Sequence, residues 1–321
     1  MSYWQEKIKI GNLEFPRFIG GPLDGITDSP FRKLVRKFSE KELLYTEMRH
    51  VACVANDRTG SKSLKLDVSE RPLNYQIAAN SITFIDQACD KILEKGVDCI
   101  DLNIGCPSKQ VTGSGSGSAL MADLPRLIEI VTHLRKRLII PLTVKIRSGF
   151  KECNALEVAK ALQDCGVDAL AIHPRLRTQR FEGRPDYALV EQVKKALTIP
   201  VIVSGGIVNF NIAKMVYEQT GVDGFLIGRG IWARPWKLQE LKEHALGNEY
   251  KTEISFIFKC ALEHLDNVIS YYGVHGLFVF RKHLPFYIRG IKNAAQLRKK
   301  LMISTELQEV RDALVQASKN L

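Results

Sequence analysis

No stretch of the sequence approaches eighteen uninterrupted apolar residues, the length that a membrane-spanning helix needs. The first ten residues, MSYWQEKIKI, are charged and lack the apolar segment of a secretory signal. Yet 45% of the 321 residues are hydrophobic, which is enough to build a substantial core. We therefore expect a folded protein that neither spans a membrane nor is exported.

The sequence also lacks any C-x-x-C pair, although it contains seven cysteines. An odd number of scattered cysteines favours neither a disulfide framework nor a zinc site. The cysteines are Cys53, Cys89, Cys99, Cys106, Cys153, Cys165 and Cys260. We expect free thiols, no metal, and a reducing, cytoplasmic environment.

A third absence concerns the G-x-G-x-x-G fingerprint of dinucleotide-binding folds, which does not follow the first apolar run. Eight short apolar or β-branched runs alternate instead with amphipathic segments such as 29–38 and 154–165. The runs are RFIGGPL, LLYTEM, PLNYQIA, VDCIDLNI, PLTVKIR, DALAIHP, PVIVSGG and DGFLIGR. This pattern predicts an α/β fold, a (β/α)8 TIM barrel, with an open doubly wound sheet as the alternative. The opening IKIGNLEF predicts a hairpin that caps the lower end of the barrel.

The strand rhythm stops near residue 247, and the rest of the chain has the pattern of helices. We expect a barrel domain over residues 1–246 and a smaller all-helical domain over 247–321. Residues 280–300 carry seven basic side chains and no acidic one. With a net charge of +11 and a pI near 9.3, this segment favours a polyanionic partner, although a solvated helix face is the simpler explanation of a charge run.

Polar residues and glycines follow each predicted strand, where barrel enzymes carry their functional groups. Two of these ends, SGGI and IGRG, place backbone N–H groups beside an arginine at strands seven and eight, where barrels commonly hold a phosphate. The ends supply Pro22, Leu23, Glu47, Gln76, Asn103, Cys106, Lys145, Arg147, His173, Arg175, Ser204, Gly205, Gly206, Gly228 and Arg229. We expect a phosphate-bearing ligand at the last two ends.

Several motifs, in order and spacing, resemble those of the dihydrouridine synthases from about Phe15 to Leu301. The motifs are GPLDGITDSPFRKL, YTEM, DLNIGCPSKQV, GSALM, LTVKIRSGF, HPRLRTQRFEGRPDY, GVDGFLIGRGIWARPW and FRKHLPFYIRG. The resemblance implies an FMN enzyme that reduces the C5–C6 double bond of a uridine in folded RNA, usually tRNA, with NADPH (or NADH) as the reductant.

The resemblance also implies a role for particular residues. Pro22 and Leu23 would lie at the flavin ring, with Gln76 and Lys145 at its polar edge. Cys106 would be the catalytic proton donor. The flavin phosphate would be bound by His173, Ser204, Gly205, Gly206, Gly228 and Arg229. Contacts to the substrate or its RNA would come from Asn103, Glu47, Arg175, Arg177, Arg281, Lys282 and Arg289.

The sequence departs from the usual family pattern at three places. Leu23 and Asp24 stand where Met-Ala is common, Pro174 where glycine is common, and SGGI where Asn-Gly-Asp is common. The loop VTGSGSGSAL also lacks basic residues that bacterial relatives often have. These departures bear on which uridine is modified more than on the chemistry.

A cysteine suits the proposed proton transfer, because a thiol in water is mostly protonated at neutral pH whereas a carboxylic acid is mostly ionised. A packed structural cysteine is the alternative explanation for Cys106. Three alternatives to a tRNA enzyme remain: the same chemistry on ribosomal RNA, an FMN barrel oxidoreductase acting on a small molecule, and a non-catalytic RNA-binding protein. We expect a monomer.

Overall fold

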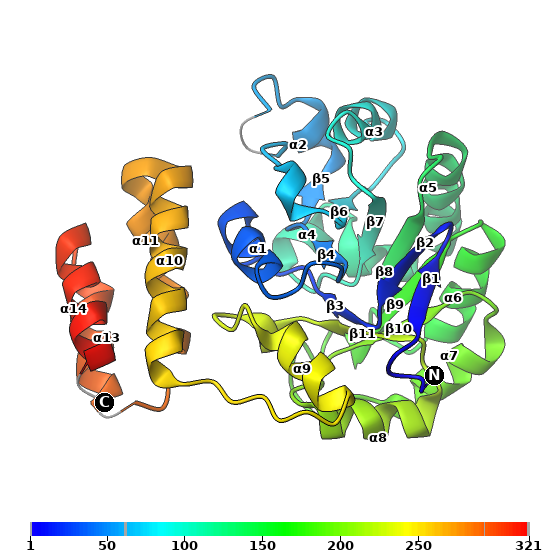
Figure 1. Cartoon of the computed structure of the whole chain (residues 1–321). Helices are drawn as coiled ribbons and strands as arrows, with labels where there is room; N and C mark the ends of the chain where they lie inside the picture. The colour runs from blue at the N-terminus through cyan, green and yellow to red at the C-terminus, as the bar shows by residue number, and fades with distance from the viewer. Residues whose placement is uncertain (1, 61–62, 292, 320–321) are drawn as a thin grey trace.

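Eight parallel strands close into a barrel in the computed structural model, which describes residues 2–60, 63–291 and 293–319 (Figure 1). The ring runs β3, β4, β6, β7, β8, β9, β10, β11 and back to β3. Their bounds are β3 (Phe18–Gly20), β4 (Leu44–Tyr45), β6 (Leu73–Ala78), β7 (Cys99–Ile104), β8 (Leu142–Gly149), β9 (Ala169–Leu176), β10 (Val201–Ser204) and β11 (Gly224–Ile227). The short β5 (Arg49–His50) adds a further parallel pairing to β6. The predicted (β/α)8 barrel is therefore confirmed, and each of the eight apolar runs overlaps one of its strands.

Barrel strands are covered on both faces, so their polar residues are buried together with their apolar ones. Every residue of β6 and of β7 is buried. The covering helices lie around the outside of the ring (Figure 1). They are α1 (Ser29–Arg36), α3 (Ile85–Leu93), α5 (Leu124–Arg137), α6 (Ala155–Asp164), α7 (Tyr187–Ala196), α8 (Phe210–Thr220) and α9 (Lys237–Ala245), with the shorter α2 (Val51–Ala55) and α4 (Lys109–Gly113) in loops.

Local sequence signals set the ends of these helices. Asp28 precedes α1, and its carboxylate accepts a hydrogen bond from the backbone N–H of Phe31 at 3.1 Å. Asn209 caps α8 in the same way, and Gly221 ends it with a φ of 64°, which glycine adopts without a steric penalty. These caps position each loop where it leaves the barrel.

The predicted N-terminal hairpin is formed by β1 (Lys7–Ile10) and β2 (Leu13–Pro16). Ile8, Ile10 and Phe15 are buried and pack in one cluster with Tyr45 and Ala169 of the barrel interior. The hairpin thereby closes the amino-terminal end of the barrel, opposite the loops that carry polar residues.

The chain after α9 is helical, as expected. Its helices are α10 (Ile254–Tyr272), α11 (Gly276–Arg281), α12 (Leu284–Tyr287), α13 (Ala294–Ile303) and α14 (Leu307–Lys319), and they stand beside α1 at one side of the barrel (Figure 1). They bury a second cluster that includes Phe258, Phe280 and Leu284, and Trp236 from the barrel side joins it. The boundary between 246 and 247 falls between α9 and α10. The division into two domains stays a prediction, because this cluster draws on both parts of the chain.

Two buried histidines lie where these helices meet α1. The rings of His264 and His283 are 4.4 Å apart, and Phe31 of α1 lies 5.3 Å and 5.7 Å from them. Burial lowers the pKa of His264 to about 3, and burial together with the adjacent His264 lowers that of His283 well below its usual range. Both imidazoles are therefore neutral in the folded protein at neutral pH.

This arrangement predicts a loss of stability in mild acid. Unfolded histidines take up a proton below about pH 6.5 but the buried ones do not, so their contribution is full above that pH and is lost as the pH falls. Replacing His283 by Phe removes an imidazole whose nitrogens have no hydrogen-bond partner among the described residues. His283→Phe should flatten the pH dependence of the unfolding free energy between pH 7 and 5 by up to about 1.4 kcal/mol per pH unit, measured by urea unfolding. The exposed His275→Gln is the control and should keep the wild-type slope; equal slopes for the two variants would contradict the assignment.

Candidate functional site

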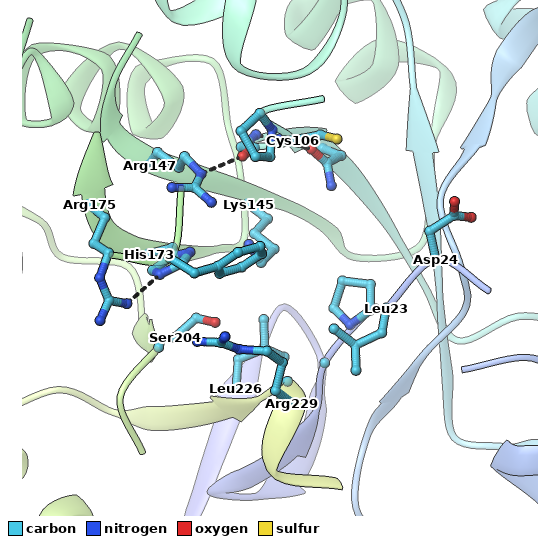
Figure 2. A pocket seen from close by; sticks show the side chains of 18 of the residues that line it. Leu23, Asp24, Cys106, Lys145, Arg147, His173, Arg175, Ser204, Leu226 and Arg229 are labelled. Carbon is cyan, nitrogen blue, oxygen red and sulfur yellow. Dashed lines mark hydrogen bonds between the residues drawn. The ribbon is translucent and has the colours of Figure 1, made fainter. Parts of the chain in front are cut away.

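A cavity of about 310 Å³ opens at the carboxyl ends of the barrel strands (Figure 2). Every strand of the ring, or the loop that follows it, contributes to its wall. The lining residues are Gly21, Pro22, Leu23, Asp24, Met48, Gln76, Asn103, Gly105, Cys106, Pro107, Lys145, Arg147, His173, Arg175, Phe181, Ser204, Gly205, Gly206, Ile207, Val208, Leu226, Gly228, Arg229 and Gly230. The barrel thus brings together groups that lie more than 200 positions apart in the chain.

One wall of the cavity is strongly cationic. Lys145, Arg147, His173, Arg175 and Arg229 all line it. Burial, reinforced by the charge of Arg147, lowers the pKa of Lys145 to about 8. Burial, reinforced by the nearby cations, lowers that of His173 to about 2. This crowding of positive charge makes the wall suited to an anion.

The histidine in this wall has a defined role in hydrogen bonding. Arg175 Nη1 lies 3.0 Å from His173 Nε2, and a guanidinium can only donate. Nε2 of His173 is therefore an acceptor, and the neutral ring carries its proton on Nδ1. A protonated ring would face Arg175 with like charge.

Two glycines make close approach possible on the same side. Gly205 and Gly206 follow β10 with φ values of +94° and +84°. A Cβ at Gly205 would lie 2.6 Å from His173 Cδ2, and one at Gly206 would lie 2.4 Å from the Tyr187 hydroxyl. Only glycine fits at either position, and the loop exposes its backbone to the cavity.

Cys106 lies on a tight turn after β7, across the cavity from Leu23 and Asp24 (Figure 2). The side-chain oxygen of Asn103 accepts hydrogen bonds from the backbone N–H groups of Gly105 at 3.0 Å and Cys106 at 2.8 Å. Ser118 donates from its hydroxyl to the Cys106 carbonyl at 2.8 Å. These bonds hold the thiol at the cavity wall.

Arg147 links this turn to the loop after β9. Its Nε donates to the Gly105 carbonyl at 2.8 Å, and its Nη1 donates to the carbonyls of Leu176 and Arg180 at 3.1 Å and 2.8 Å. The following Phe181 is half exposed, lines the cavity, and has the Arg229 guanidinium 4.5 Å from its ring centroid. The loop over 176–183 therefore forms part of the cavity wall.

Fourteen of the residues selected from the sequence line this cavity together. They are Pro22, Leu23, Gln76, Asn103, Cys106, Lys145, Arg147, His173, Arg175, Ser204, Gly205, Gly206, Gly228 and Arg229. Their individual roles as catalytic, cofactor or substrate groups stay predictions.

Five others lie outside the cavity lining. Glu47 instead binds the backbone N–H of Gly25 at 2.6 Å and the guanidinium of Arg49 at 2.9 Å. Arg177 lies over the ring of Phe150, with 4.9 Å to its centroid. Arg281 donates to the carbonyl of Ser304 and lies over Phe278. Lys282 and Arg289 are in the C-terminal helical part, and Lys282 reaches toward Gly25 at the cavity rim. Lys292 of the basic segment lies outside the described residues.

The sequence placed Arg147 at a strand end without a defined role, and it selected neither Asp24, Met48 nor Phe181 as a site residue. Arg147 follows Lys145 by two positions and so points to the same side of β8. Phe181 lies five positions beyond the end of β9, and no periodic signal connects it to the cavity.

The fold and the cavity together define a (β/α)8 enzyme with a cationic, glycine-lined site at the carboxyl end of the barrel. A solved structure of morphinone reductase shares this fold, with a TM-score of 0.56 at 12% identity, over 78% of this chain and 91% of that one.

The family model described as "Dihydrouridine synthase (Dus)" matches residues 19–321. The probable tRNA-dihydrouridine synthase 1 of Synechocystis is 35% identical, over 98% of this chain and 90% of the relative. The tRNA-dihydrouridine synthase B of Pseudomonas aeruginosa is 32% identical, over 91% of this chain and 90% of the relative. The chain belongs to the dihydrouridine synthase family, and it is an oxidoreductase.

The glycine geometry generates a prediction about the cationic wall. Gly205→Ala should lower the unfolding free energy by about 1–3 kcal/mol, because alanine is strained at this positive φ and its methyl group would collide with His173. Gly221→Ala is the matched control, since its φ of 64° is also positive but nothing lies within 4 Å of its Cβ. Urea unfolding of both variants measures the difference. Equal losses would show that the contact with His173 relaxes freely.

Proposed function

We propose that this enzyme reduces the C5–C6 double bond of a uridine in tRNA to dihydrouridine, with bound FMN and with NADPH as the reductant. The observation that carries the proposal is one cavity in which a cationic, glycine-lined wall faces a thiol on a braced turn. The relatives named tRNA-dihydrouridine synthase support tRNA as the substrate. For a tRNA substrate we propose a cytoplasmic location, and we propose that the protein acts as a monomer.

The residues present fit a flavin phosphate. The N–H groups of Gly205 and Gly206 would approach it without a side chain between, and His173 and Arg229 stand beside them. Lys145 and Gln76 would hold the polar edge of the ring, which accepts hydrogen bonds, and Pro22 and Leu23 would contact its apolar part. When bound, FMN would supply the hydride that C6 of the uracil receives.

Cys106 would deliver the proton that completes the reduction. Addition of hydride at C6 leaves an electron pair at C5 and O4, and a proton from Sγ of Cys106 would form the new C–H bond at C5. Asn103 would contribute less than the sequence indicates, because its oxygen is occupied by two backbone N–H groups. One N–H of its amide remains for a carbonyl of the base.

RNA would bind through exposed cations of the loop after β9 and of the C-terminal helical part. Arg180 and Arg184 are exposed on the loop after β9, and Arg289, Arg298 and Lys299 are exposed in the C-terminal helical part. The target uridine must leave its stack to reach the cavity, as nucleotides of a folded RNA loop do.

No membrane-spanning helix occurs in residues 2–60, 63–291 and 293–319.

Removal of the thiol tests the proposed reaction. Cys106→Ala should slow reduction of uridine in tRNA by roughly 10²- to 10⁴-fold, the usual scale of general acid catalysis. Reduction of the flavin by NADPH should survive, and heating should release FMN from both proteins. The substrate is tRNA from a strain that lacks the enzyme, and the dihydrouridine formed in it by each purified protein is measured. The exposed Cys153→Ala is the control, and unchanged turnover in Cys106→Ala would assign the proton to another group.

Removal of charge from the C-terminal helices tests the RNA surface. Each phosphate contact that a protein loses reduces the slope of log affinity against log salt concentration by a little under one. The triple variant Arg289→Gln, Arg298→Gln, Lys299→Gln should therefore lower the salt slope by roughly two to three units and raise the Kd for tRNA. The matched control is Lys9→Gln, Lys95→Gln, Lys136→Gln, which removes three exposed charges toward the amino-terminal end of the barrel. Identical salt slopes for the two triple variants would show that the basic segment faces solvent without binding RNA.

A further inference from the structure

A buried chain of hydrogen bonds runs beneath the cavity from Asp101 to the turn that carries Cys106. Asp101 is fully buried within β7, and its Oδ2 accepts from Gln76 Nε2 at 2.7 Å. Gln76 Oε1 accepts from Asn103 Nδ2 at 2.8 Å. Asn103 Oδ1 in turn accepts from the N–H groups of Gly105 and Cys106. A single chain of donors and acceptors thus joins the carboxylate to the turn.

The direction of this chain is set at Asp101. Thr143 Oγ1 accepts from Asn74 Nδ2 at 3.0 Å and therefore donates its own proton to Asp101 Oδ1, 2.6 Å away. Above the pKa of about 7 to which burial raises Asp101, both of its oxygens are acceptors, so Gln76 must turn its NH₂ group toward them. A reversed Gln76 would place its oxygen against the carboxylate, which is costly in a buried site.

The same logic fixes the next amide. With its NH₂ toward Asp101, Gln76 presents only its oxygen to Asn103, so Asn103 must donate to it from its own NH₂ group. Its oxygen is then left to bind two backbone N–H groups of the turn. A reversed Asn103 would lose both bonds and would direct N–H groups at N–H groups.

We propose that Asp101 is a positioning residue, which orients the Gln76 and Asn103 amides and so holds the Cys106 turn in its reactive geometry. Each amide then has one N–H without a partner among the described residues, so the cavity floor favours ligand carbonyl oxygens over donors. The catalytic part of this inference rests on the proposed function of Cys106. The structural part, the orientation of the two amides and of the turn, is independent of that function.

Hydrogen exchange measures the structural part in the full-length protein. Asp101→Asn keeps the shape of the side chain but offers Gln76 either a donor or an acceptor, so both amides lose their fixed direction. Exchange of the Gly105 and Cys106 amides should become at least tenfold faster, with no change in α10, whose protection reports global stability. The measurements are made at pH 8, above the pKa of about 7 to which burial raises Asp101.

Thr143→Ser is the matched control. It removes a buried methyl group beside the same carboxylate but keeps the hydroxyl that donates to Asp101, so Asp101 stays an acceptor for Gln76. The two amides of the turn should keep near wild-type exchange in this variant. Equal acceleration in Thr143→Ser and Asp101→Asn would overturn the proposal, since the effect would then come from loosened packing.

A second variant keeps the test decisive if Asp101→Asn does not fold. Gln76→Met breaks the chain one link later and leaves the Thr143 bond to Asp101 in place. It should accelerate exchange at Gly105 and Cys106 as Asp101→Asn does. Unchanged exchange in Gln76→Met would overturn the proposal.

Kinetics separate this inference from the proposed function. Asp101→Asn should slow reoxidation of the reduced flavin by tRNA by about 10- to 100-fold, the effect of a small misplacement of a reacting group. Reduction by NADPH should slow much less than reoxidation, because the proposed contacts to the flavin phosphate do not depend on Asp101. Faster exchange with unchanged reoxidation would overturn the positioning role, whereas full activity of Cys106→Ala would instead remove the proposed function of the thiol.

Discussion

Strand β11 pairs with β3 in parallel, with Leu226 opposite Ile19, and this pairing turns the sheet into a ring. An open sheet would leave the ends of its first and last strands far apart. In the ring, Pro22 and Leu23 after β3 lie in one cavity with Arg229 after β11. The short β4, with only Leu44 and Tyr45, joins β3 to β6 and completes the closure. The whole site depends on these backbone hydrogen bonds, because each strand end supplies one part of it.

Closure also concentrates positive charge. Lys145, Arg147, His173, Arg175 and Arg229 share one wall, in which burial and the neighbouring cations keep His173 neutral and lower the pKa of Lys145 to about 8. Arg147 and Arg175 also donate hydrogen bonds to backbone carbonyls of the loop after β9. The remaining positive potential is available to an anion, which fits the proposed flavin phosphate. The charge that would bind a cofactor therefore also shapes the loop around it.

The C-terminal helices are attached to the same rim. Tyr272 donates to Asp28 at 3.0 Å, and Trp232, which follows β11, stacks on Phe286 with ring centroids 4.1 Å apart. Lys282 approaches Gly25 in the loop after β3. Helices that carry exposed cations are thus joined directly to loops that line the cavity, which suits a large folded polyanion that must present one base to a deep site.

The sequence alone determined the eight strands, the helical C-terminal part and fourteen residues of the cavity, because period, turn residues and strand-end position are local properties. It could not separate Glu47 from the cavity residues, because the backbone N–H of Gly25, 22 positions away, reaches the Glu47 carboxylate only in the folded chain. Nor could it show that Phe181 reaches the cavity or that Arg281 turns to Ser304. The direction of the Asp101, Gln76 and Asn103 chain is likewise tertiary, because it exists only when neighbouring strands β6, β7 and β8 bring those groups within hydrogen-bond distance.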